Sequence, residues 1–110
     1  MAVNETVFSR AMSNGATSST SVAYASGTDC EDILLPIRAS VVCQLSFDAA
    51  GTAKLQATNT PHDDVRAGNG VYADWDVGDV TTTVQAVCVG VTAVRVVRTS
   101  GTPRITITLA

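Results

Sequence analysis

The C-terminal end of the chain, residues 80–110, reads VTTTVQAVCVGVTAVRVVRTSGTPRITITLA and decides the fold class. Its Val, Thr and Ile residues favour strands over helices. Within residues 105–109 apolar and polar residues alternate, which is the period-two pattern of a half-buried strand. Ser100-Gly101-Thr102 is a short glycine-containing connection. Residues 91–99 and 103–109 are therefore predicted to form a β-hairpin on which the earlier strands assemble.

The same alternation recurs earlier in the chain. Residues 38–47 and 52–58 alternate on either side of the turn Asp48-Ala49-Ala50-Gly51, which predicts a second hairpin. The inward-facing residues are predicted to be Ala39, Val41, Cys43, Leu45, Phe47, Ala53, Leu55 and Ala57. Turn signals recur about every 8–12 residues, a rhythm typical of sandwiches and jelly rolls. We predict an all-β fold, a single jelly-roll-like β-sandwich of seven to eight antiparallel strands.

A chain of 110 residues fits one domain with its own core. Residues 1–26 are predicted to form an N-terminal extended arm or edge strand, which packs on the domain or on a neighbouring molecule. Residues 27–110 are predicted to form the sandwich. The large apolar side chains of the first part of the arm are Val3, Val7 and Phe8.

The composition points to a weakly charged surface. Charged residues make up 15% of the chain, against roughly 25% in an average soluble protein. Such a surface suits a protein that contacts other protein over much of its area; the alternative is a small Thr-rich β domain without that role. The net charge of −3 offers no basic field, so we expect neither nucleic acid nor a membrane as partner. The sequence shows neither a secretion signal nor an apolar run of about 18 residues.

Three cysteines, Cys30, Cys43 and Cys88, lack CxxC spacing, which argues against a disulfide framework and a zinc site. Cys43 and Cys88 lie in apolar strand patterns and are predicted to be buried thiols. Maturation in a reducing cytoplasm is expected.

Two polar groups are candidates for chemistry. His62, Asp63 and Asp64 follow Pro61, and the favoured interpretation is local hydrogen bonding in a turn rather than metal binding or acid–base catalysis. Asp74 and Asp76, with Asp79, lack the glycine placement of a calcium loop and are interpreted as a solvated acidic face. No GxSxG, SxxK or phosphate-binding glycine motif occurs. We therefore predict no catalytic residue, no metal, no cofactor and no enzymatic activity.

Trp75 and Tyr72 lie three residues apart beside a loop, where aromatic rings could stack on a sugar. The competing interpretation places a lone Trp of a small sandwich in the core or at the rim of an interface.

Two segments resemble small bacteriophage virion proteins. In those proteins a strand of the form G-x-x-x-L-Q-x-T/S-N precedes a variable loop and a Trp-containing strand, and a closing hairpin has the form V-x-x-V-R-V-x-x-T-S-G-T. The resemblance covers roughly the C-terminal half of the chain. The residues that carry it are Gly51, Leu55, Gln56, Asn59, Trp75, Val94, Arg95, Val96, Thr99, Ser100 and Gly101.

Among such proteins the chain is most similar to capsid decoration proteins (cement or staple proteins) of short-tailed phages. The resemblance implies a jelly-roll-like fold on the outside of the shell, made in the host cytoplasm, that ties neighbouring major capsid proteins together. It further implies a homo-oligomer, a dimer or trimer, at symmetry axes. A head-fibre base or tail-tip sandwich is the alternative, and a carbohydrate-binding module is the third possibility.

Under this hypothesis the contact regions are residues 2–26 and the loop of residues 59–70. The candidate interface residues are Val3, Val7, Phe8, His62, Val65, Tyr72, Trp75, Arg95 and Arg98.

Overall fold

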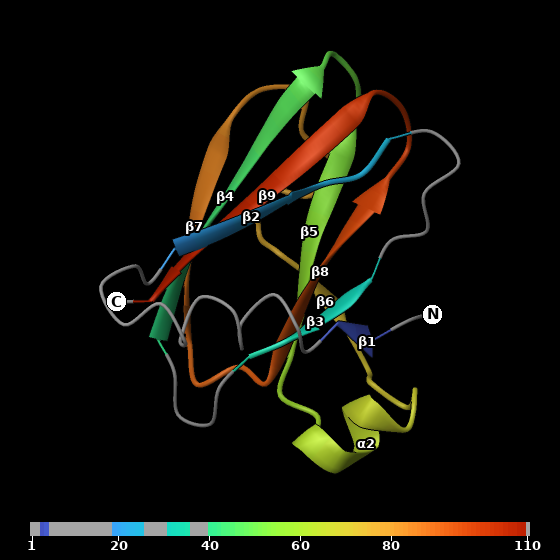
Figure 1. The fold of residues 1–110 in the computed structure, drawn as a ribbon, viewed down its shortest axis with the longest axis vertical. Coiled ribbons are helices and arrows are strands. Elements are labelled where there is room, and N and C mark those ends of the chain that lie inside the picture. The colour runs from blue at the N-terminus through green and yellow to red at the C-terminus, as the bar shows by residue number, and fades with distance from the viewer. Residues whose placement is uncertain (1–2, 5–18, 26–30, 36–39, 110) are drawn as a thin grey trace.

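A computed structural model of the chain describes residues 3–4, 19–25, 31–35 and 40–109. The elements within these ranges are nine strands and one short helix (Figure 1). Their bounds are β1 Val3–Asn4, β2 Ser19–Ala23, β3 Asp32–Leu34, β4 Ser40–Ala49, β5 Ala53–Thr58, α2 His62–Arg66, β6 Ala73–Asp74, β7 Val84–Val89, β8 Ala93–Arg98 and β9 Thr102–Leu109. The helix in these ranges is too short to cross a bilayer.

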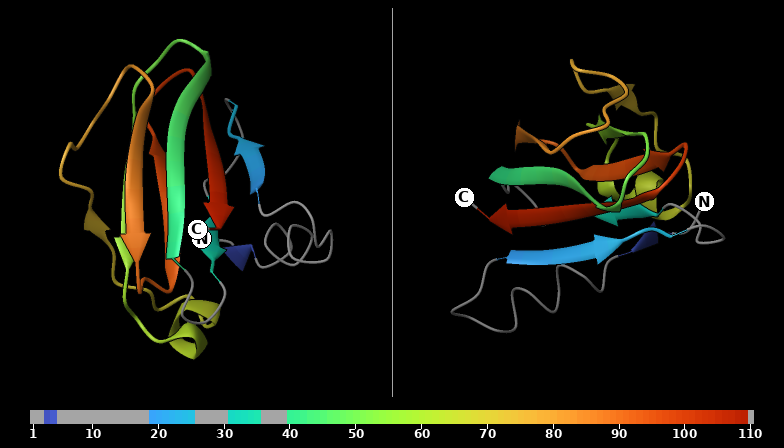
Figure 2. Two further views of the ribbon diagram at one scale, coloured as in Figure 1. Left: turned by 90° about the vertical axis from the view of Figure 1, so that its left-hand side faces the viewer. Right: turned by 90° about the horizontal axis from the view of Figure 1, so that it is seen from above.

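The strands form two sheets packed face to face (Figures 1 and 2). Sheet I has the order β2-β9-β4-β7, and sheet II has the order β1-β3-β8-β5-β6. The two-residue β1 runs parallel to β3, whereas all other neighbours are antiparallel. Apart from β1, the described chain is a sandwich of eight antiparallel strands in two four-stranded sheets. The predicted fold class is confirmed.

The connectivity is that of a jelly roll. When the eight strands from β2 to β9 are numbered along the chain, the sheets read 1-8-3-6 and 2-7-4-5. The first strand pairs with the last, and pairing continues inward as β3 with β8, β4 with β7 and β5 with β6. A long antiparallel hairpin wound into two layers produces this pattern. β2, from the segment predicted as an arm or edge strand, is the edge of sheet I.

Both predicted hairpins are wrong. β8 pairs with β3 and β5 in sheet II, while β9 pairs with β2 and β4 in sheet I. β4 and β5 likewise belong to different sheets. Each short glycine-containing connection therefore crosses from one sheet to the other. Alternation and a glycine turn are common to hairpins and to such crossing connections, so the local sequence does not distinguish them.

The two crossing connections lie at the end of the sandwich opposite α2 and are joined to each other (Figure 1). The Thr52 N–H donates to the Ser100 carbonyl oxygen at 3.2 Å, and the Thr99 N–H donates to the Thr52 carbonyl oxygen at 2.9 Å. A Cβ on Gly51 would overlap the Ser100 backbone. A Cβ on Gly101, which has a φ of 73°, would lie 2.5 Å from the Ala49 carbonyl oxygen. Only glycine allows the backbones this approach.

The main core lies between the sheets, and the predicted inward faces are confirmed where they are described. Its fully buried members include Val41, Cys43, Leu45, Ala53, Leu55, Val94, Val96, Ile105 and Ile107. The outward residues of β9, such as Arg104 and Thr106, are partly exposed. Cys43 and Cys88 are buried free thiols, as predicted, and Cys30 and Ala39 lie outside the described residues. A hydrogen bond with Cys88, together with burial, raises the pKa of Cys43.

A second, smaller cluster covers the outer face of sheet II. It consists of Leu34, Val65 and Ala93, with Tyr72 packed against them. Val65 belongs to α2, which interrupts the stretch that the sequence predicted as a loop. The helix begins after Pro61, and its first turn contains the two acidic residues Asp63 and Asp64. The segment after α2 forms the two-residue strand β6, which pairs with β5, and it meets β5 again at Val80, which bridges to Ala53.

Candidate functional site

The structure separates the predicted interface residues into different regions. Val3 lies in β1, next to β3, while Val7 and Phe8 lie outside the described residues. Arg98 is at the end of β8, where its Nε donates to the Gly101 carbonyl oxygen at 2.6 Å. This bond places Arg98 at the crossing connections, away from α2.

His62, Val65, Tyr72 and Arg95 come together on the outer face of sheet II. The Nε2 of His62 donates to the Leu35 carbonyl oxygen at 2.9 Å. The Arg95 guanidinium lies over the Tyr72 ring, 3.9 Å from its centroid. Val65 has no exposed surface. These contacts attach α2 and the segment after it to the sheet, and they leave Val65 unable to reach a partner without opening the cluster.

Arg95 is also part of a polar network that crosses sheet II. Its NH1 lies 3.6 Å from Oδ1 of the buried Asp32, and its Nε donates to Gln56 Oε1 at 2.7 Å. Gln56 Nε2 in turn donates to Asp74 Oδ1 at 2.6 Å, and Lys54 Nζ lies 3.2 Å from the same oxygen. These two donors lower the pKa of Asp74. The network pairs Arg95 with Asp32 and Lys54 with Asp74, and it supports the sheet.

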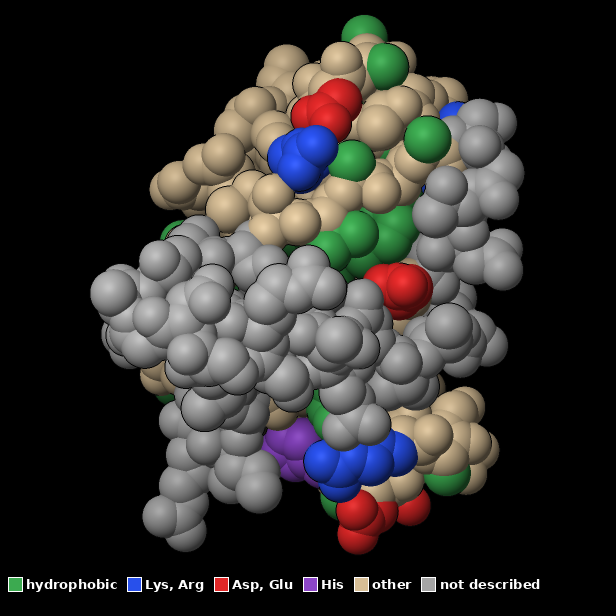
Figure 3. Space-filling view, in the orientation of Figure 1, with side chains coloured by type: hydrophobic (Ala, Val, Ile, Leu, Met, Phe, Trp, Pro, Cys, Tyr) green, Lys and Arg blue, Asp and Glu red, His purple; other side chains and the backbone are tan. Residues whose placement is uncertain are grey.

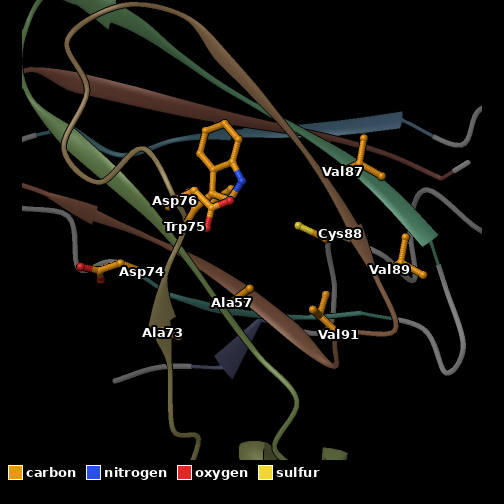
Figure 4. Close-up of a pocket in the computed structure, with 10 residues that line it drawn as sticks. Ala57, Ala73, Asp74, Trp75, Asp76, Val87, Cys88, Val89 and Val91 are labelled. Carbon is orange, nitrogen blue, oxygen red and sulfur yellow. The ribbon is translucent and has the colours of Figure 1, made fainter.

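A hollow lies at the side of the sandwich where the edges of the two sheets meet. After β6 the chain continues beside β5: the Trp75 N–H donates to the Leu55 carbonyl oxygen at 2.9 Å, and beyond a turn at Gly78, which has a φ of 69°, Val80 pairs with Ala53. Both sheets end here, at β6 and at β7. The two edges leave a groove of about 270 Å³ between them. We call this hollow the β6–β7 groove (Figure 4).

The β6–β7 groove is mostly apolar. Trp75, which is half-buried, and Cys88 are prominent in its lining, with Asp76 nearby (Figure 4). The complete lining is Leu55, Ala57, Ala73, Asp74, Trp75, Asp76, Val87, Cys88, Val89 and Val91. A neighbouring hollow of about 240 Å³ shares Ala57, Ala73 and Val91 with it. The two hollows therefore lie next to each other along this side of the sandwich.

Exposed valines gather at the same place. Val87 and Val89 on β7 are each 70% exposed, and Val71, in the lining of the neighbouring hollow, is 78% exposed. Of the large hydrophobic side chains exposed in the described residues, only Val77 lines neither hollow. Single exposed hydrophobics are ordinary, but several around one groove indicate a binding surface. We call Val71, Val87, Val89 and the β6–β7 groove the open-side surface.

Of the predicted interface residues that the structure describes, only Trp75 belongs to the open-side surface. The sequence prediction did not include Val87 and Val89, which alternate along β7 with the buried Ala86 and Cys88. A signal was present: VQAVCV places Val on the outward face as well, and a solvated face normally carries polar residues.

The aromatic pair does not form a sugar platform. Trp75 packs against the main core, whereas Tyr72 packs against the cluster under α2. A spacing of three residues in extended chain places the two rings on opposite faces. Burial, together with the nearby Asp32 carboxylate, raises the pKa of Tyr72, and the Arg95 guanidinium over the ring opposes this shift.

The acidic groups are dispersed. Asp63 pairs with Arg66 at 3.1 Å, and Asp74 pairs with Lys54. Within the part of the chain that the structure describes, no group of three or more His, Cys, Asp and Glu side chains could hold a metal ion. On the face in Figure 3 the described charged side chains form separate groups rather than one field.

A scan of the sequence against protein-family models finds no match. A search of curated proteins finds no similar sequence at a significant level.

Proposed function

We propose that this protein is a non-enzymatic structural protein of a bacteriophage virion, which binds the outside of the capsid and ties neighbouring major capsid proteins together. The observation that supports it most is the open-side surface, where three exposed valines line an apolar depression on a weakly charged jelly roll. Jelly rolls serve capsids, lectins and cupins alike, so the fold does not select among them. The capsid role draws on the resemblance of residues 51–75 and 91–109 to virion proteins.

The chemistry of the open-side surface favours a protein partner over a sugar or a small ligand. The β6–β7 groove, at about 270 Å³, falls below the range of roughly 300–1,000 Å³ that is usual for small-molecule sites. Val87 and Val89 present methyl groups to water on a strand without any charged residue. Covering them with protein stabilises a complex by about 1 kcal/mol or more per side chain.

A small binding surface on each copy is sufficient for a protein that decorates a capsid. Many equivalent copies on one shell, arranged as dimers or trimers at symmetry axes, multiply weak individual contacts through avidity. A head-fibre base or tail-tip component would use the same surface chemistry at a few positions in the particle, so the copy number separates the two proposals.

The test is the amount of this protein in gradient-purified particles of the encoding phage, measured by quantitative mass spectrometry. We expect many copies per capsid for the natural chain. The double variant Val87→Thr, Val89→Thr keeps the β-branched shape, and loss of apolar contact should lower its affinity about tenfold or more. Val77→Thr makes the same change at a valine that is 53% exposed but lines neither hollow, and it should bind like the natural chain.

Absence of the protein from particles would overturn the capsid role, and equal occupancy by all variants would overturn the open-side surface as the contact. A few copies, found only at the tail by immunogold labelling, would replace the capsid role with the fibre or tail-tip role.

A further inference from the structure

β7 is an edge strand with an open side. In sheet I it has β4 as its neighbour on one side, and among the described residues no backbone group bonds to its other side. Its sequence, VQAVCV, contains no charged residue and no proline. Edge strands are usually protected by Lys, Pro or a bulge against pairing with another chain. The outer edge of β7 lacks these features.

The groove lies where the next strand of sheet I would place its inward side chains. Ala86 and Cys88 of β7 face the core, and Cys88 reaches the β6–β7 groove (Figure 4). Because side chains alternate along a strand, a strand added beyond β7 would direct every second side chain toward Trp75. Its other side chains would lie on the outward face next to Val87 and Val89.

We propose that β7 binds an extended segment of a partner protein by β-strand addition. The added strand hydrogen-bonds to the outer edge of β7 and seats apolar side chains, at alternate positions, in the β6–β7 groove. This inference rests on the proposed function only in taking the partner to be a protein. Backbone pairing supplies affinity in this mode, and the groove selects the side chains.

A second copy of this chain fits the site poorly. Its β7 would present Ala86 and Cys88 toward the groove, and these small side chains are already buried in their own core. A six-residue edge at about 3.3 Å per residue and a sheet depth of about 10 Å offers roughly 200 Å². A stable dimer needs about 800 Å² on each copy.

The charge at the rim specifies one more feature of the partner. Asp76 is exposed and lines the groove, while the neighbouring Asp74 is already paired with Lys54. β7 supplies no basic residue. A Lys or Arg of the added strand that lies near Asp76 therefore strengthens its binding. The segment that we infer is extended, apolar at alternate positions and basic at one end.

The test uses the full chain, labelled with ¹⁵N, and a capped nine-residue peptide in which Val alternates with Thr and one end carries Lys. Two control peptides carry N-methyl groups, one on the Val residues and one on the Thr residues. Each control removes the N–H donors from one edge of the peptide. Amide exchange of β7 and the chemical shifts of the groove residues are followed by NMR at millimolar peptide.

We expect the peptide to slow exchange tenfold or more at alternate amides of β7, those that point away from β4. One N-methylated peptide should lose this effect and the other should keep it, because addition uses a single edge. If both N-methylated peptides bind like the parent, or if no β7 amide gains protection, strand addition is wrong.

Variants locate the side-chain contacts. Ala73→Leu, at an exposed position of β6 that lines the groove, should weaken peptide binding by fivefold or more, because the larger side chain fills the space that the peptide side chain would occupy. Asp76→Asn, at an exposed position, should weaken peptide binding about two- to fivefold. Val77→Thr should change nothing. Equal binding by all three variants would place the peptide elsewhere and overturn the proposal.

The outcomes separate this inference from the capsid role. Particle binding without protection of β7 would reject strand addition alone. Protection of β7 in a protein that is absent from particles would reject the capsid role alone.

Discussion

Replacing Gly101 with alanine tests how the two crossing connections meet. Gly90 offers a matched control, because its φ of 72° equals the 73° of Gly101 while a Cβ at Gly90 would touch nothing within 4 Å. Both variants incur a positive-φ cost of about 1–2 kcal/mol, offset in part by the reduced entropy of the unfolded chain. Gly101→Ala additionally places Cβ 2.5 Å from the Ala49 carbonyl oxygen and 2.6 Å from that of Ala50.

That overlap involves backbone on both sides, so it cannot be relieved by turning a side chain. Overpacking of this kind costs about 1–3 kcal/mol. We therefore expect Gly101→Ala to be less stable than Gly90→Ala by about 2 kcal/mol. Urea unfolding followed by circular dichroism measures this difference as a shift of about 1 M in the midpoint. Midpoints that agree within about 0.2 M would refute the close contact between the two connections.

Three further substitutions test the packing and charge of the sheets. Arg104 donates a hydrogen bond to Asp48 at 2.8 Å and lowers the Asp48 pKa, so the stabilisation from this pair is present above about pH 4 and is lost as the pH falls. Arg104→Gln should therefore reduce the drop in the urea midpoint between pH 5 and pH 3. An unchanged drop would contradict the pairing. Arg95→Ala leaves the buried Asp32 without its cation and should lower the free energy of unfolding in urea by about 2–4 kcal/mol. Adding Asp32→Asn should restore part of this stability. No recovery would show that the unpaired Asp32 charge is not the cause of the loss. Ile107→Val, in the main core, should cost about 0.5–1.5 kcal/mol in the same assay, and no loss would put Ile107 outside a tight core.

The faces of the long strands were predictable because period-two alternation follows directly from the pleat. Val41, Cys43 and Leu45 of β4 are buried as their spacing indicates, and so are Ile105 and Ile107 of β9. Local alternation reports which side chains face the core, and it does so whichever strand lies alongside.

Strand partners were not predictable in the same way. Gly51 and Gly101 suggested two hairpins, yet both residues lie in connections that cross between sheets. Their role depends on contact between two segments about fifty positions apart in the sequence. Only the jelly-roll winding brings these segments together, and no local pattern encodes it.

The coverage of β8 shows the same limit. Its sequence has apolar residues on both faces, and the sequence alone does not show what covers each face. Both faces are covered by the chain itself: Val94 and Val96 by the main core, and Ala93 by the cluster that includes Val65 of α2. The five-residue helix is too short for helical periodicity to reveal it.

The candidate site was only partly accessible from the sequence. The sequence left open whether Trp75 lies in the core or at the rim of an interface, and the structure places it half-buried at the β6–β7 groove and packed against the main core. The exposure of Val87 and Val89 depends on β7 being the last strand of sheet I. Strand order is a property of the whole fold, so it could not be obtained from β7 itself.

The most direct test of the capsid role is an electron cryo-microscopy reconstruction of purified particles at a resolution that traces the chain. We expect this jelly roll on the outer surface of the shell, with the outer edge of β7 paired to an extended segment of a capsid subunit and the β6–β7 groove filled. A particle without this protein, or one in which the β7 edge faces solvent, would contradict that expectation.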